Sequence, residues 1–220
     1  MRKELHPAVR WLLVGLGGLV VVSIGGAIAD GGDVGSVERS VFDAVNDLPG
    51  WLDRPLWVFQ QCGNLVVAVV LGVVVALALR RWEVAIAVLV AAFLKLRFEE
   101  TVKDVVQRSR PGTSIGEGVH LRGDVSEGGL SYVSGHAVIT AAVAGVLTPI
   151  LPGRWKVVPW VVVGLNAVGR VYVGAHNPLD VVGGIALGLV IAGLLNALLL
   201  WTSPRRRLGR VRGRSAPATP

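Results

Sequence analysis

The sequence predicts an all-α fold, a bundle of six membrane-spanning helices with a short interfacial helix in the first outer loop. The main evidence is two uncharged apolar runs, at residues 11–29 and 181–201, because a helix needs about 20 such residues to cross a bilayer. Of the 220 residues, 52% are hydrophobic and 17% are charged, whereas about 25% are charged in soluble domains. This composition excludes a soluble globular enzyme and a disordered chain, and the single Cys62 excludes an internal disulfide.

Four shorter apolar stretches supply the other predicted helices, at residues 65–79, 84–94, 137–151 and 157–168. They lack the strict alternation of a strand, and only helices and closed barrels satisfy their backbone groups in lipid. Each must extend through flanking polar residues to cross the bilayer, and the second of the four must run from about Glu83 to Phe98. Four or five crossings are alternatives to six.

The distribution of Lys and Arg predicts the orientation. With six crossings, one side of the membrane receives the basic residues of both termini and of two turns, namely Arg2, Lys3, Arg10, Arg80, Arg81, Arg154, Lys156 and six arginines after residue 204. The positive-inside rule makes this side cytoplasmic. We therefore predict a multi-pass protein of a bacterial-type plasma membrane, with a cytoplasmic tail at residues 1–10, a membrane-embedded domain at 11–201 and a basic, disordered cytoplasmic tail at 202–220.

The excess of positive charge belongs to that second tail. The net charge is +7, but the six arginines of the tail account for most of it and no aromatic residue is interleaved with them. This pattern indicates contact with anionic lipid head groups and does not favour a nucleic-acid partner.

The first outer loop carries a helical pattern between residues 35 and 52. Its apolar residues are spaced as on one face of a helix, at Val37, Val41, Phe42, Val45 and Leu48. The pattern predicts a short amphipathic helix that lies in the membrane interface or covers the outer end of the bundle. We expect no catalytic role for it.

Polar groups beside membrane helices are functional candidates, and the first cluster follows the third predicted helix. Lys103, Gln107 and Arg110 stand at i, i+4 and i+7, so a continuous helix would place them on one face, ending before Pro111. Two cations on one face can clamp a phosphate. The alternative is a charged segment that lies among the lipid head groups.

The second cluster lies at the predicted start of the fourth helix. Ser134, Gly135 and His136 follow a glycine-rich approach, and the free N–H groups of a helix N-terminus favour anions. Ser134 is either the N-cap of this helix or a donor to a phosphate oxygen.

The third cluster lies between the fifth and sixth predicted helices. Asn177 and Pro178 predict a helix start, with His176 just outside it and Asp180 in its first turn. The carboxylate of Asp180 can then hold the imidazole in one tautomer and stabilise its cation. The alternative role of Asp180 is to complement the helix dipole, which leaves His176 and Arg170 unexplained.

Together the clusters indicate phosphoryl chemistry at the outer membrane face. Three cations suit a tetrahedral dianion, one histidine backed by an aspartate suits a nucleophile, and a second histidine suits a proton donor. A serine hydrolase does not need three cations. A metal site is not favoured because the neighbouring Lys and Arg side chains would repel the ion.

These residues resemble the type 2 phosphatidic acid phosphatase family of membrane lipid phosphatases, whose motifs are KxxxxxxRP, PSGH and SRxxxxxHxxxD. The matching positions are Lys103 and Arg110-Pro111, then Val133-Ser134-Gly135-His136, then Gly169-Arg170, His176 and Asp180. Two positions depart from the motifs, since Val133 replaces a proline and Gly169 replaces a serine that is an additional phosphate donor. Neither change removes a group expected to do chemistry.

The resemblance implies a role for each matching residue. His176 attacks phosphorus and forms a phosphohistidine, Asp180 orients His176, and His136 protonates the leaving oxygen and then activates water. The phosphoryl oxygens are held by Lys103, Arg110, Ser134, Gly135 and Arg170. The resemblance implies no metal and no cofactor.

The implied substrates are membrane lipid phosphates or pyrophosphates of the undecaprenyl diphosphate, phosphatidate or phosphatidylglycerol phosphate type. Two alternatives stay open: a phosphoryl transferase between lipid head groups, and a non-catalytic protein that binds anionic lipid. A haloperoxidase that uses the same site is a further use within the resemblance, and the membrane setting argues against it. The loop at residues 112–130, with its charged side chains, is a candidate gate. The sequence indicates no oligomeric state.

Overall fold

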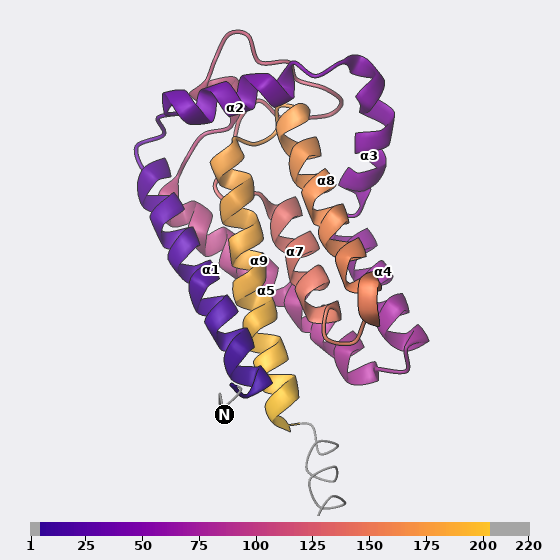
Figure 1. Cartoon of the computed structure of the whole chain (residues 1–220). Coiled ribbons are helices and arrows are strands. Elements are labelled where there is room, and N and C mark those ends of the chain that lie inside the picture. Colours follow the sequence, from indigo (N-terminus) through magenta and orange to yellow (C-terminus); the bar gives the residue numbers. More distant parts are fainter. Residues whose placement is uncertain (1–4, 203–220) are drawn as a thin grey trace, which may run out of the picture.

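The computed structural model describes residues 5–202, and every regular element in that part of the chain is helical (Figure 1). The predicted all-α fold is confirmed. The α-helices are α1 Pro7–Ala29, α2 Ser36–Asn46, α3 Asp53–Gln61, α4 Leu65–Ala78, α5 Trp82–Val106, α6 Pro111–Ser114, α7 Gly135–Leu147, α8 Val158–Tyr172 and α9 Pro178–Thr202. Two 3₁₀ turns, η1 Gly50–Leu52 and η2 Gly153–Val157, precede α3 and α8.

Each apolar stretch of the sequence forms a helix, but the helices differ in their fitness to cross a bilayer. Within the described residues, α1 and α9 are long and apolar enough to cross a bilayer. The segment of η1 and α3 is bent by 62° relative to α4, and the two form a third candidate span if they are counted together. Helix α7 is apolar but short. Helix α5 is long but carries charged residues along its second half. The described residues therefore contain two or three candidate membrane spans, and the number of six crossings stays a prediction.

Small residues let the central helices approach closely. Helices α1 and α9 pack antiparallel (Figure 1), and a Cβ added to Gly193 would lie 2.7 Å from the carbonyl oxygen of Trp11. On another face of α9, a Cβ at Gly188 would lie 2.6 Å from the carbonyl oxygen of Val138 in α7. Such contacts are typical of helix packing in membranes. They fix α9, and with it the position of its first turn.

Helix α2 lies across the end of the bundle where α8 ends and α9 begins (Figure 1). The predicted amphipathic helix of the first outer loop is thus present, with Phe42 and Asn46 buried under it and Val37 exposed. The Asn46 amide donates to the carbonyl oxygens of His120 and Tyr172 at 3.0 and 2.9 Å. These bonds tie α2 to the long loop and to the end of α8.

The opposite end of the bundle collects the basic turns. The start of α1, the turn between α4 and α5, the connection between α7 and α8 and the end of α9 all lie away from α2 (Figure 1). Arg80 and Arg81 belong to the turn between α4 and α5. Arg154 and Lys156 belong to the connection between α7 and α8. The tail residues 1–4 and 203–220, which carry the remaining basic residues of the predicted cytoplasmic side apart from Arg10, lie outside the described part of the chain.

Candidate active site

The first turn of α9 begins where the sequence predicts it. Pro178 is the first helical residue, where its missing N–H costs nothing. The backbone N–H of Asn177 donates to Asp180 Oδ2 at 2.7 Å, so Asp180 folds back over the helix start. The Asn177 side chain does not cap the helix; its amide donates to Ser114 Oγ at 3.3 Å.

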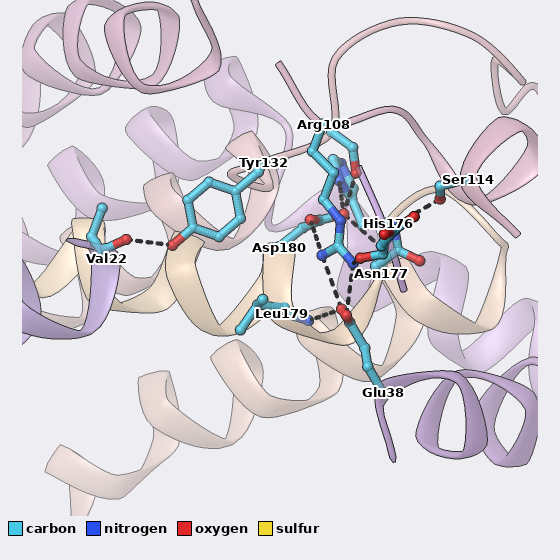
Figure 2. Close-up of polar contacts among 11 residues, drawn as sticks. Val22, Glu38, Arg108, Ser114, Tyr132, His176, Asn177, Leu179 and Asp180 are labelled. Atoms are coloured by element: carbon cyan, nitrogen blue, oxygen red, sulfur yellow. Dashed lines mark hydrogen bonds and ion pairs between the residues drawn. The ribbon is translucent and has the colours of Figure 1, made fainter. Parts of the chain in front are cut away.

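Asp180 is fully buried and its carboxylate has several donors (Figure 2). Oδ1 accepts from Arg108 Nη1 at 3.2 Å, and Oδ2 accepts from the Ser131 hydroxyl as well as from the Asn177 amide. His176 lies beside this carboxylate with Nδ1 3.7 Å from Oδ2, which is longer than a hydrogen bond. The structure therefore brings Asp180 and His176 together as the sequence predicts.

Arg108 is a residue of this site that the sequence analysis missed. Its side chain is completely buried and lies between two carboxylates, Asp180 and Glu38 of α2, with Nη2 donating to Glu38 Oε2 at 2.6 Å (Figure 2). Arg108 stands two residues before Arg110 in the first cluster, so a basic residue was visible there. Nothing in the sequence pairs it with Glu38.

His176 is held in its neutral form. Only 3% of its surface is exposed, and this burial lowers the pKa of the imidazole to about 4, although Asp180 acts in the opposite direction. The positive charges of Arg170 and Arg110 lower the pKa further. A neutral imidazole keeps a lone pair for nucleophilic attack at neutral pH.

The start of α7 lies against the same region. Ser134 occupies the N-cap position, and its backbone N–H donates to the carbonyl oxygen of Asp180 at 2.9 Å. Its hydroxyl makes no capping bond and is buried without a partner among the described residues. His136 is the second residue of α7 and packs against Gly63, which lies between α3 and α4. The contact is so close that a Cβ added to Gly63 would lie 2.7 Å from His136 Cδ2.

Several buried donors of the site have no protein partner within residues 5–202. Arg170 donates through Nη1 to Gln60 Oε1 at 3.0 Å, but its Nε is buried and unpaired, as is Nε of Arg110. The hydroxyl of Ser134 is a third such donor, and His176 Nδ1, Arg108 Nε and Asn177 Oδ1 also have no partner among the described residues. Buried polar groups are normally paired, so the three open donors at motif positions suit an anionic ligand.

The prediction that Lys103, Gln107 and Arg110 share a helix face is wrong. Helix α5 ends at Val106, because Gln107 takes the left-handed conformation with φ of 49° and donates its N–H to the carbonyl oxygen of Lys103. Pro111 does not end that helix but begins α6, since proline fits a first helical position. Arg110 therefore reaches the site from a non-helical segment, where it is the N-cap residue of α6.

Lys103 makes its contacts one turn back along α5. Its ammonium lies 2.6 Å from Glu99, which also pairs with Lys95 at 2.6 Å. The Glu99 carboxylate in turn packs against Gly135, where it would clash with an added Cβ. Lys103 thus reaches the start of α7 through Glu99, and within the described residues no hydrogen bond joins it directly to the other predicted phosphate-binding residues.

The long loop predicted as a gate is attached to the bundle. Arg122 donates to the carbonyl oxygen of Tyr172 at 2.6 Å and its guanidinium stacks 4.2 Å from the centroid of the Tyr172 ring. The His120 N–H donates to Asn46 Oδ1 at 2.8 Å. Both contacts hold the loop against the ends of α2 and α8.

The fold and this set of side chains define the class of protein as a membrane phosphatase built from helices. The chain belongs to the PAP2 superfamily, whose family model matches residues 81–204. The family indicated by the three motifs is thereby confirmed, and the protein is a hydrolase of the lipid phosphatase group.

The relatives agree with this assignment. The chain is 32% identical over 170 residues to the decaprenylphosphoryl-5-phosphoribose phosphatase of Mycobacterium tuberculosis, covering 74% of this chain and 89% of the relative. Its fold is similar to Aquifex aeolicus LpxE, with a TM-score of 0.67 and 21% identity over 76% of this chain and 98% of that one. It is also similar to the PAP2-type phosphatidylglycerolphosphate phosphatase of Bacillus subtilis, with a TM-score of 0.66 and 20% identity over 86% and 98%.

Proposed function

We propose that this protein hydrolyses a phosphomonoester or pyrophosphate on a membrane lipid at the outer membrane face, through a phosphohistidine at His176. The observation that carries the proposal is a group of buried donors at motif positions without a partner among the described residues, namely Arg110 Nε, Arg170 Nε and the Ser134 hydroxyl. A phosphoryl group supplies the oxygens that these donors lack. Arg is suited to this task because its planar fork matches phosphate geometry.

The first step transfers the phosphoryl group to the enzyme. Since Nδ1 of His176 faces Asp180, Nε2 is the atom that attacks phosphorus, and the bond from phosphorus to the lipid oxygen breaks. His136 gives a proton to that leaving oxygen. Asp180 stabilises the positive charge that develops on His176, and the arginines with Ser134, the Gly135 amide and Lys103 stabilise the phosphoryl oxygens.

The second step releases phosphate. His136, now deprotonated, accepts a proton from water as the water oxygen attacks phosphorus. The bond between phosphorus and His176 Nε2 breaks, and the imidazole returns to its neutral form. Burial favours that neutral form, which assists departure of the histidine from phosphorus.

An apolar groove supports a lipid as the leaving group. The groove has a volume of about 550 Å³ and runs between α4, α7 and α8, bounded by apolar side chains almost throughout. Its wall includes Cys62 and Thr140, and the Thr140 hydroxyl bonds to the carbonyl oxygen of His136 at 2.8 Å. The groove thus reaches the helical turn of α7 that follows His136, and it offers apolar space for the chain of a lipid whose head group lies in the site.

The relatives support polyprenyl and glycerolipid phosphates as the candidate substrates. The curated relative acts on decaprenylphosphoryl-5-phosphoribose and one structural neighbour acts on phosphatidylglycerol phosphate. We therefore retain undecaprenyl diphosphate, phosphatidate and phosphatidylglycerol phosphate as candidates and add the phosphoribosyl polyprenyl phosphate.

Exposed tryptophans support the proposed topology of six crossings with cytoplasmic termini. Trp82, Trp155 and Trp201 are 66%, 57% and 60% exposed on elements at the end of the bundle that carries the basic turns. Trp51 and Trp57, 73% and 60% exposed, belong to η1 and α3 near the other end. Tryptophans gather at both interfaces of a membrane, so these side chains fit a bundle that reaches from one interface to the other. The positive-inside rule assigns the end with the basic turns to the cytoplasm, which makes the end covered by α2 the outer face and α2, with its exposed Val37, the interfacial helix.

The substitution His176→Ala tests the proposal. We expect phosphate release from a panel of lipid phosphates and pyrophosphates in detergent to fall by more than about 10³-fold, since the nucleophile is lost. The matched control is His120→Ala, because the His120 side chain is 61% exposed and its imidazole contacts the exposed Asp47. It should retain turnover, and vanadate should inhibit both the control and the wild type.

Two outcomes would overturn the proposal. If a correctly inserted His176→Ala protein still releases phosphate, the phosphohistidine at His176 is contradicted. If the wild type phosphorylates an added lipid acceptor and releases no free phosphate, the reaction is a transfer and not a hydrolysis.

A further inference from the structure

We propose that Glu38, acting through Arg108, is a positioning residue that sets the charge and orientation of the Asp180–His176 pair. The inference rests on the proposed function of His176 as nucleophile. It assigns a role in the reaction to α2, a helix of the first outer loop that contributes none of the motif residues.

Glu38 is fixed to the site by three hydrogen bonds. Its Oε1 accepts from Arg108 Nη1 at 3.0 Å and from the backbone N–H of Leu179 at 2.8 Å, and its Oε2 accepts from Arg108 Nη2 at 2.6 Å (Figure 2). Leu179 directly precedes Asp180 in the first turn of α9. Glu38 therefore holds both the backbone that carries Asp180 and the cation that contacts its carboxylate.

Arg108 transmits the effect because it has no access to solvent. Its side chain is 0% exposed, as is that of Asp180, and that of Glu38 is 13% exposed. Charges in such surroundings are weakly screened and act on one another strongly. Glu38 and Asp180 share one guanidinium, so the net charge of the three side chains is −1, which is matched when His176 becomes cationic during the attack.

Other charged groups also face His176, and they oppose this stabilisation. Arg110 from the segment before α6 and Arg170 from α8 are both cations that disfavour the imidazolium of His176. His136 from α7 also interacts electrostatically with His176. Glu38 and Asp180 are thus the anions that balance these cations. Arg108, Arg110, Arg170 and the two carboxylates carry a net charge of +1, and the loss of either anion raises it to +2 around the nucleophile.

The geometry distinguishes Glu38 from the ordinary surface pairs of α2. Asp43 on the same helix pairs with Arg39 at i,i+4, with side chains 43% and 39% exposed. The bonds of Glu38 instead lead out of α2, to Arg108, which is 70 residues away in the sequence, and to the start of α9.

The substitution Glu38→Gln provides the first test, with Asp43→Asn as the matched change from acid to amide. The amide side chain introduced by Glu38→Gln keeps an oxygen for the Leu179 N–H, so the fold is retained while the charge is lost. We expect kcat on phosphatidate in detergent micelles to fall about tenfold with KM within about twofold, the scale seen when a partner that orients a reacting side chain is removed. Asp43→Asn should leave both constants unchanged.

The pKa of His176 provides a readout that a structural clamp would not move. Removing the negative charge in Glu38→Gln should lower this pKa, whereas removing the positive charge in Arg108→Gln should raise it, and the double variant should return it close to the wild-type value. Acid titration of the His176 Cε1–H signal by NMR in micelles measures the shift without turnover, with the signal assigned by its loss in His176→Asn. In the active enzyme, the acidic limb of kcat/KM should move in the same directions.

The result that overturns the inference is equally specific. If Glu38→Gln behaves like Asp43→Asn in kcat and in the titration of His176, Glu38 only anchors α2. Glu38 is also only a structural contact if Glu38→Gln loses kcat without a shift in the pKa of His176. The same conclusion follows if Glu38→Gln and Arg108→Gln shift that pKa in the same direction. If Arg108→Gln fails to fold, Glu38→Gln against Asp43→Asn decides alone. Should the wild type release no phosphate from any lipid of the panel, the proposed function fails, and the NMR shifts still decide whether Glu38 controls His176.

Discussion

The two sides of His176 differ in how their polar groups are satisfied. On the side of Asp180, a carboxylate has donors from Arg108, Ser131 and a backbone amide. On the other side, Arg110, Arg170 and Ser134 each keep a buried donor atom without a partner among the described residues. The Asp180 carboxylate is satisfied within the protein, although Arg108 Nε and His176 Nδ1 beside it have no hydrogen-bond partner among the described residues. The open donors of the second side suit the oxygen atoms of the proposed ligand.

This difference separates orientation from recognition. A satisfied network rigidifies the residues in it, which suits the groups that must hold a nucleophile in one geometry. Unsatisfied donors are expensive when buried, so the fold keeps them where substrate binding recovers the loss. The comparison leads us to expect that substitutions on the satisfied side reduce both stability and activity, and that those on the unsatisfied side reduce activity alone.

The largest combined effect is expected for Asp180→Asn. The change leaves Arg108 with one anion in place of two, and breaking a buried ion pair destabilises a protein by about 3 kcal/mol. Turnover should also fall by roughly 10³-fold, since the imidazolium of His176 loses its counter-charge. Thermal unfolding in detergent and phosphate release measure the two effects, and a fully stable Asp180→Asn protein would contradict the assignment of this side as a satisfied network.

Arg110→Gln should show the opposite balance. It removes a donor for the phosphoryl oxygens, so kcat/KM should fall about 10²- to 10³-fold. The free energy of unfolding should stay the same or rise slightly, because the change removes a buried donor that no described residue satisfies. Arg39→Gln on α2 is the control for a general loss of positive charge, and it should leave turnover intact. A marked loss of stability in Arg110→Gln would show that Arg110 has a structural task.

Which of these residues the sequence could identify depends on how local their signals are. The helices were predictable because apolar runs and a helix start such as Asn177-Pro178 are local, and α4 and α9 begin within a few residues of the predicted positions. The motif residues His176 and Asp180 were predictable for the same reason, since a spacing of four within one turn brings them together.

The rest depends on contacts between distant segments. Arg108 and Glu38 are 70 residues apart, and no periodicity within either segment indicates their partner. The end of the helix at Val106 was missed because Gln107 adopts a left-handed conformation. A glycine at this position would have indicated such a conformation in the sequence, but a glutamine does not. The sequence therefore predicted the local pair of His176 and Asp180, and it missed the contacts that join distant segments to that pair.

The smallest effects come from two serines, and they sharpen the comparison because the same change is made on each side. Ser131→Ala removes a donor to the buried Asp180 carboxylate, and a hydrogen bond to a charged group contributes about 1.5–3 kcal/mol. An N-cap serine usually contributes about 1 kcal/mol, but the Ser134 hydroxyl makes no capping bond, so Ser134→Ala should change the free energy of unfolding by less than about 0.5 kcal/mol. Ser134→Ala should also lower kcat/KM roughly 10-fold, since the hydroxyl is lost as a donor to phosphate.

Unfolding curves and turnover of Ser131→Ala and Ser134→Ala, measured side by side in one detergent, test this comparison. If Ser134→Ala is the less stable protein and Ser131→Ala the less active one with unchanged stability, the division of the site into a positioning side and a binding side is wrong.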